Sequence, residues 1–210
     1  MGLREILTGK SSVKQPAKTD RLFALSTAYV TLQASYNIGC GGVAGIVVQA
    51  LATSDFQSVL TDTEEVVKAT AGEFKATIET TDDDFGFRWV IVHDPEVEDL
   101  VATINAVVSS IEDGGYGERL LAAVFAFKGA DGGAINFIYN FKRGTWYPFV
   151  PAPGDKQRNT ERELQLKAQI GGFIRDIKGE GPPSPDVVSD SKAGLIERAD
   201  KLLLGLQKVQ

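Results

Sequence analysis

The chain has 210 residues, of which 43% are hydrophobic and 24% charged, a balance that fits a folded globular protein and excludes global disorder. Its formal net charge of −6 excludes nucleic-acid binding through an overall positive field. The single cysteine, Cys40, excludes an internal disulfide and a cysteine-based metal site, and no apolar run reaches the roughly 18 residues of a membrane span.

The first 17 residues are predicted to form a flexible N-terminal arm, because residues 10–18 carry Ser, Gln and Pro. Leu3, Ile6 and Leu7 can make one apolar helical turn. The arm is therefore either a frayed terminus or a short amphipathic foot for a partner or a lipid surface. The core domain is expected over residues 18–178.

A first helix is predicted from Arg21 to about Tyr36, with Asp20 as its cap. The glycine-rich residues 39–45 are interpreted as a turn, since no helix follows to form a phosphate-binding loop. The β-branched residues 43–50 then predict a strand.

A capping box at residues 61–64 predicts a short helix over 62–71. Strands are predicted at 74–80 and 85–93, joined by an acidic turn at 82–84, and together they indicate a hairpin. Alternation in the second strand predicts one shared face for Phe85, Phe87, Trp89 and Ile91.

Asp94 and Pro95 mark the start of the next helix, whose buried stripe is expected at Leu100, Ile104, Val107 and Ile111 and whose end is expected at Gly114-Gly115. The apolar run 120–127 predicts a central strand covered on both sides. Residues 135–141 alternate as a half-buried strand, Lys142-Arg143-Gly144 turns the chain, and Trp146 to Phe149 leads out.

A second capping box, at residues 160–163, predicts another helix. Residues 179–189 are rich in Gly and Pro and indicate a linker. Residues 190–210 are predicted to form a C-terminal amphipathic helix with a heptad stripe at Leu195, Ala199, Leu202, Leu206 and Val209. This helix either folds back on the core or docks on a partner, and both alternatives stay open.

Because helices separate groups of antiparallel strands, the predicted class is α+β. The simplest arrangement is a single antiparallel sheet with helices packed on one face.

Residues that could carry chemistry have simpler interpretations. His93, the only histidine, lacks a recognisable nucleophile motif and is expected at the surface or beside a helix cap. The acidic run 82–84 lacks the spaced oxygen ligands of a calcium loop. Cys40 is reactive only if it is exposed with a lowered pKa. We therefore expect no catalytic residue, no cofactor and no metal.

Lys142, Arg143, Trp146 and Tyr147 interleave cations with aromatic rings. This composition is typical of a platform for single-stranded nucleic acid. A β-turn whose aromatic rings pack into the core is the preferred interpretation, and the same exposed turn could bind an acidic partner surface.

Several segments resemble a known family. They are Met1-Gly2-Leu3 with Leu7-Thr8-Gly9, Asp20 to Leu25, Asp84 to Trp89, Asp99-Leu100-Val101, Gly115-Tyr116-Gly117 with Leu120-Leu121, Tyr139 to Phe149, and Glu161 to Leu166. In combination they resemble the PspA-associated protein family PspAB, over roughly residues 1–175. The tail from Gly179 departs from the family's pattern.

The resemblance implies a cytoplasmic, non-enzymatic accessory protein of the phage-shock envelope-stress system. Its expected partner is a PspA-like coiled-coil protein, through which it would reach the inner face of the membrane, and it could also form a homo-oligomer. Nucleic acid is not an expected partner. The element order is similar to the YbjN and type III secretion chaperone-like fold, a likeness of fold alone.

The predicted partner contacts are Lys142, Arg143, Trp146 and Tyr147, with Leu195, Leu202 and Leu206 if the tail helix docks outward. Two alternatives from other classes stay open. One is a single-stranded nucleic-acid-binding module that uses the Lys142–Tyr147 turn. The other is a small-molecule enzyme, which would need a polar pocket near His93.

Overall fold

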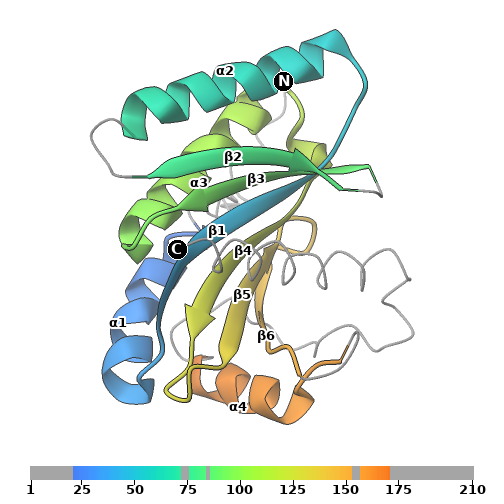
Figure 1. The fold of residues 1–210 in the computed structure, drawn as a ribbon. Coiled ribbons are helices and arrows are strands. Elements are labelled where there is room, and N and C mark those ends of the chain that lie inside the picture. Colours follow the sequence, from blue (N-terminus) through green and yellow to red (C-terminus); the bar gives the residue numbers. More distant parts are fainter. Residues whose placement is uncertain (1–20, 72–75, 84–85, 153–156, 171–210) are drawn as a thin grey trace, which may run out of the picture.

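A computed structural model describes residues 21–71, 76–83, 86–152 and 157–170 (Figure 1). They form a six-stranded antiparallel sheet in the order β2-β3-β1-β4-β5-β6. The strands are β1 (Gly39–Gln49), β2 (Thr77–Asp82), β3 (Phe87–His93), β4 (Leu120–Lys128), β5 (Ala134–Asn140) and β6 (Thr145–Phe149). The helices are α1 (Ala24–Tyr36), α2 (Ser54–Ala71), α3 (Val97–Asp113) and α4 (Thr160–Ile170), with a short 3-10 turn, η2 (Gly117–Arg119), before β4.

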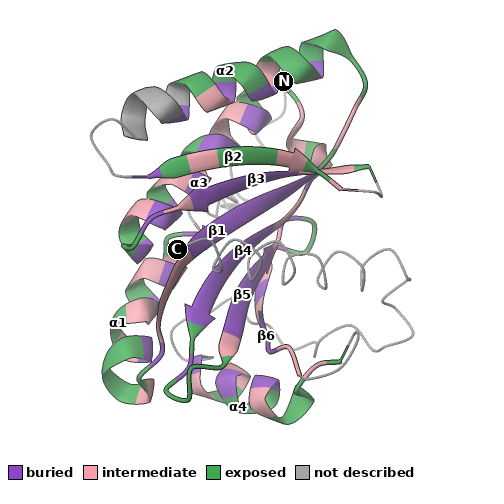
Figure 2. Cartoon of the chain, in the orientation of Figure 1, coloured by how far each residue is buried: buried purple, intermediate pink, exposed green. Residues whose placement is uncertain are grey.

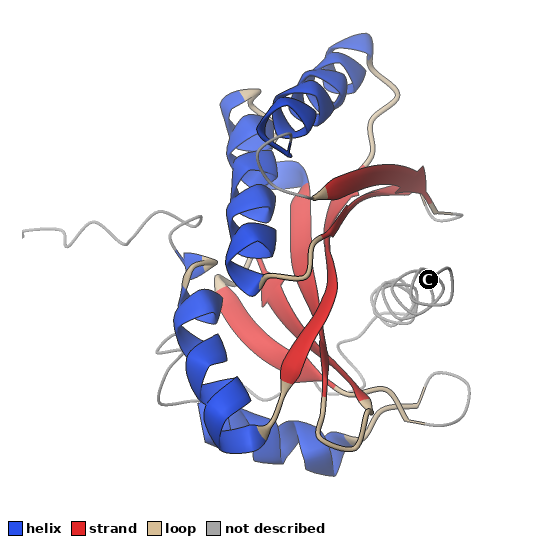
Figure 3. Cartoon of the chain, turned by 60° about the vertical axis from the view of Figure 1, so that its left-hand side comes forward, coloured by secondary structure: helices blue, strands red, loops and turns tan. Residues whose placement is uncertain are grey.

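The predicted α+β class with one antiparallel sheet is therefore confirmed, and α1, α2 and α3 pack on one face of the sheet (Figures 1 and 3). The predicted arm, the linker at 179–189 and the helix at 190–210 lie outside the described residues. The likeness to the YbjN and type III secretion chaperone-like fold stays a prediction.

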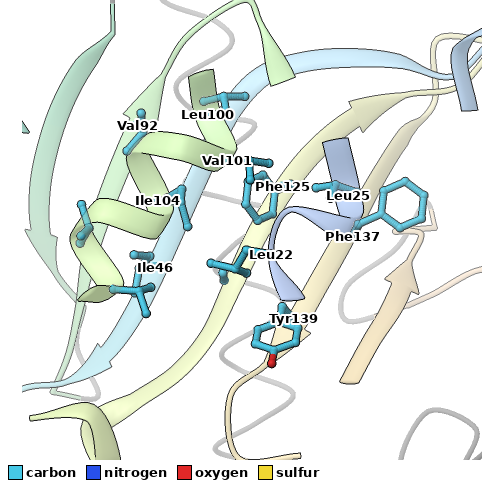
Figure 4. Packing of buried hydrophobic residues seen from close by; sticks show 14 of the residues in the cluster. Leu22, Leu25, Ile46, Val92, Leu100, Val101, Ile104, Phe125, Phe137 and Tyr139 are labelled. Carbon is cyan, nitrogen blue, oxygen red and sulfur yellow. The ribbon is translucent and has the colours of Figure 1, made fainter. Parts of the chain in front are cut away.

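The main core lies between this face of the sheet and the helices. α3 contributes its predicted stripe, and all four residues of that stripe are buried. Leu22, just before α1, and Leu25 in α1 point toward Phe125 of β4 and toward Phe137 and Tyr139 of β5 (Figure 4). Buried positions are concentrated on the inner strands, whereas β2 is largely exposed (Figure 2). The helix-covered face is thus a conventional hydrophobic core.

Two strands form the edges of the described sheet. β2 pairs only with β3 among the described strands, and its sequence is polar except for Ile78. β6 pairs with β5 and contains Pro148, which has no amide hydrogen to donate.

The glycine-rich residues 39–45 are a strand and not the predicted turn. β1 already begins at Gly39, and its pairing with β4 is interrupted between Cys40 and Ala44 by a bulge. Gly42 adopts a φ of 76°, which only glycine adopts at little cost. The glycines here indicate a β-bulge within a strand, and the prediction of a turn did not consider this possibility.

Both predicted capping boxes are wrong. α2 begins at Ser54, so Thr61 lies inside the helix and its hydroxyl donates to the Gln57 carbonyl oxygen at 3.0 Å. At α4, the side chain of Asn159 accepts the Arg162 amide at 2.9 Å and caps the helix in place of Thr160. Glu163, the expected closing residue of that box, is buried and accepts the amide of Val150 at 3.0 Å. Tertiary contacts therefore override the local capping pattern of the sequence.

The bulge makes Gly41 a sensitive position. A Cβ atom there would lie 2.7 Å from the Ala126 carbonyl oxygen, in the backbone of the neighbouring strand. We expect Gly41→Ala to lower the free energy of unfolding by about 1–3 kcal/mol, because the β1–β4 pairing must shift. Gly39→Ala is the matched control, since nothing lies within 4 Å of its Cβ position. Urea unfolding of both variants is the measurement, and equal stabilities would contradict the tight approach.

Candidate partner-binding surface

The sheet has a second apolar face, on the side away from α1, α2 and α3. Side chains alternate along each strand, so the neighbours of the core residues point to this side. Its buried residues, which we call the second sheet face, are Val43, Val47, Trp89, Ile91, Val124, Ala126, Ile138 and Phe149. Among the described elements, no helix lies over this face; the helices stand on the other side or at one end of the sheet (Figure 3).

Strand register arranges this face as a continuous row. Ile91 lies opposite Gly45, Gly45 opposite Val124, Val124 opposite Ile138, and Ile138 opposite Tyr147. The row therefore crosses five strands from β3 to β6, a width of about 19 Å at the usual strand spacing. A Cβ on Gly45 would meet the Trp89 ring at 3.7 Å, so the glycine leaves room beside the indole.

The indole of Trp89 is fixed by a hydrogen bond to the connection between β2 and β3. Its Nε1 donates to the Asp83 carboxylate at 3.2 Å, and another oxygen of Asp83 accepts the Phe87 amide at 3.0 Å. Hydrogen bonds from Arg88 lower the pKa of the neighbouring Asp82, with N–O distances of 2.6 and 2.7 Å. The predicted hairpin is confirmed, and Asp82 and Asp83 stabilise it; Asp84 lies outside the described residues.

Cationic and aromatic groups surround the β6 end of the second sheet face. The Arg158 guanidinium lies 5.6 Å from the centre of the Phe149 ring and forms an ion pair with the buried carboxylate of Glu163. Removal from water raises the pKa of Tyr147 to about 12, and the positive charges of Arg158 and Arg143 act in the opposite direction. Arg143 is therefore electrostatically coupled to the Tyr147 hydroxyl.

The structure separates the four predicted contact residues of the turn. Lys142 and Arg143 are exposed at the predicted turn, where Gly144 adopts a φ of 64°. Tyr147 packs against the second sheet face. Trp146 is buried on the opposite, helix-covered face, and its Nε1 donates to the Arg21 carbonyl oxygen at 3.1 Å. The preferred interpretation, a turn with an aromatic ring in the core, is confirmed for Trp146.

A buried Trp146 cannot stack on a nucleobase without leaving the core, so the nucleic-acid alternative loses its largest aromatic group. The remaining predicted contacts, Leu195, Leu202 and Leu206, lie outside the described residues.

The other sequence candidates have structural partners. His93 Nε2 and Glu79 Oε1 are 2.9 Å apart at the β2–β3 edge. Burial raises the pKa of the Cys40 thiol, whose sulfur accepts the Gly42 amide at 3.3 Å, so the thiol is not activated. Within the described ranges, no three His, Cys, Asp or Glu side chains gather to hold a metal ion.

The sequence analysis predicted that the apolar run 120–127 is covered on both sides, but it assigned no residues to the second sheet face. A further signal for this face was not used. This signal lies in β1, where six consecutive residues from Val43 to Val48 carry no polar side chain and are all buried. An apolar residue at every position of a strand requires a covering layer on each face.

Ionisation of Tyr147 predicts a loss of stability in alkali. A tyrosine in an unfolded chain has a pKa of about 10, so its contribution is fully present below pH 10 and is lost as pH rises toward 12. We expect the wild type to lose on the order of 1 kcal/mol more than Tyr147→Phe between pH 9 and pH 11.5. Urea unfolding at both pH values measures the difference, and identical losses would show that Tyr147 is not shielded from water.

No curated protein and no solved structure matches the chain. None of the helices in the described ranges has the length and apolar character needed to cross a bilayer. The family model of PspA associated protein B, PspAB, matches residues 1–177, which include every described element of the fold. The chain therefore belongs to the PspAB family.

Proposed function

We propose that this protein is a non-enzymatic adaptor that binds a PspA-like coiled-coil protein through the second sheet face. Membership of the PspAB family indicates a PspA-associated accessory role in the phage-shock stress response. The direct contact, its site and a cytoplasmic location that reaches the membrane through the partner are our proposals.

One observation carries the proposed site. An apolar row crosses five strands of the described sheet, and no helix among the described elements lies over it. An amphipathic helix binds such a surface by placing its apolar stripe against it. A coiled-coil protein consists of helices with apolar stripes, so its chemistry matches this surface.

The border of the face supplies groups that can orient a helix. Lys142 and Arg143 are exposed where β5 turns into β6, next to Tyr147 at the end of the apolar row. Charges at the edge of an interface mainly affect the association rate and the register of the partner. Acidic side chains along one side of the partner helix would therefore lie beside this turn.

The chemistry of the described residues supports a binding role. His93 is engaged by Glu79, and the Cys40 thiol has a raised pKa. Neither is arranged with a nucleophile and a base as covalent catalysis requires.

The apolar part of the site is tested with two phenylalanines. Phe87 is partly buried and packs at the edge of the second sheet face, whereas Phe23 is 43% exposed beside α1 on the helix side. We expect Phe87→Ala to weaken binding of a purified PspA-like protein about tenfold, through loss of apolar contact area. Phe23→Ala should leave the affinity unchanged. Isothermal titration calorimetry is the measurement, and equal affinities of the two variants would exclude this face as the site.

The polar border is tested with two charge reversals. Arg143→Glu changes the turn beside Tyr147, and Lys128→Glu changes an exposed cation at the opposite end of the β4–β5 pair. We expect Arg143→Glu to weaken partner binding about fivefold at low salt, with the loss reduced at high salt. Lys128→Glu should have no such effect. A salt-independent loss, or the same loss in both variants, would argue against an electrostatic contact at residue 143.

A further inference from the structure

The second sheet face is buried more completely than the described elements explain. Val47 and Trp89 are 0% exposed and Ile138 is 1% exposed. Arg158 covers the Phe149 ring at one end, but no described helix lies over the row between β3 and β5. A side chain on an uncovered sheet face keeps contact with water, so this degree of burial requires a covering layer from outside the described ranges.

From this we infer that the C-terminal segment, residues 190–210, docks as an amphipathic helix on the second sheet face of its own chain and must leave before a partner can bind there. The docking stands on the burial of the face and on the sequence of the tail. The competition with a partner rests, in addition, on the proposed function.

The dimensions of the tail match the face. A helical stripe from Leu195 to Val209 is about 21 Å long at 1.5 Å per residue, and the apolar row from β3 to β6 is about 19 Å wide. Two heptads are too short to be stable as a helix alone in water. The stripe therefore gains its stability from a surface, and the second sheet face is apolar over the same length.

The connection to the tail is long enough. The described chain ends at Ile170 in α4, which contacts β6 at one end of the face. Residues 171–189 can span up to about 60 Å when extended, several times the width of the face. The family match ends at residue 177, so the tail lies beyond the part that defines the family.

The N-terminal arm is a weaker candidate for the cover. It enters the described chain at Arg21, whose side chain donates to the Gly144 carbonyl oxygen at 3.0 Å and whose own carbonyl accepts from Trp146. The next residue, Leu22, is buried in the helix-covered core. The apolar turn predicted in the arm, at Leu3, Ile6 and Leu7, is one helical turn long, which is too short to cross five strands.

Two neighbouring tail substitutions test the docking in the full chain. Leu206 lies on the predicted stripe, and Gln207 lies about 100° away from it on a helix. Leu206→Asp and Gln207→Asp add the same charge. The chain has two tryptophans, Trp89 on the second sheet face and Trp146 in the helix-covered core, so their indole signals in NMR spectra report the two faces separately.

We expect Leu206→Asp to shift the Trp89 indole signal and to speed its hydrogen exchange at least about tenfold, with the Trp146 signal unchanged. Gln207→Asp should leave both signals in place. An unmoved Trp89 signal in Leu206→Asp, with Trp146 intact, would overturn the proposal.

Cross-linking of the wild type identifies the occupant without altering the fold. Lys128 at the end of β4 and Lys142 in the turn between β5 and β6 are exposed, and the tail carries Lys192, Lys201 and Lys208. In a mixture of unlabelled and ¹⁵N-labelled protein, we expect amine cross-links from the tail lysines to Lys128 or Lys142 within one chain. Cross-links that join only different copies, or cross-links from Lys10 in place of the tail, would overturn the assignment.

Competition is tested with a purified PspA-like protein and the same two variants. If the tail occupies the face about nine-tenths of the time, its release raises the apparent affinity about tenfold. Leu206→Asp should therefore bind more tightly than the wild type, and Gln207→Asp should not. If the Trp89 signal moves but the affinity is unchanged, the docking of the tail is supported and the competition with a partner is excluded. No binding by any of the three proteins would remove the proposed function, while the Trp89 result would still decide the docking.

Discussion

The structure depends on one constraint, which is that the two central strands are apolar on both faces. β1 is buried at six consecutive residues, 43–48, and β4 at five consecutive residues, 123–127. A strand of this kind needs a covering layer on each face, because an uncovered face would expose a continuous apolar surface to water. α1, α2 and α3 cover one face. The second sheet face therefore requires a covering layer of its own, and we propose that a helix supplies it.

Much of the fold could be predicted from the sequence, because local signals and tertiary contacts agree there. The stripe of α3 and the β2–β3 hairpin come from periodicity that burial then satisfies. The prediction that β5 is half-buried is wrong, because five consecutive residues, 135–139, are buried. The predictions fail where a residue has a tertiary role. Gly42 forms part of a bulge and not of the predicted turn. Glu163 accepts hydrogen bonds from Arg158 and Val150 and does not close the predicted capping box.

The candidate site was less predictable, because it is made by register between distant strands. Ile91, Gly45, Val124, Ile138 and Tyr147 come from five strands and form no motif in the sequence. The turn at 142–147 was recognisable by composition, but alternation within β6 sends Trp146 and Tyr147 to opposite faces. Of the four predicted contact residues, Tyr147 therefore lies at the end of the proposed surface, Trp146 lies on the opposite face, and none lies at the centre of the surface.

The composition of the two edge strands has a consequence for self-association. An unpaired strand edge can add a strand from another molecule and so begin aggregation. At the β2 edge, an added strand would lie beside the charged side chains of Glu79 and Asp82. At the β6 edge, Pro148 has no amide hydrogen to donate to an added strand. The margins of the described sheet thus resist growth into extended β-assemblies, even though its second face is apolar.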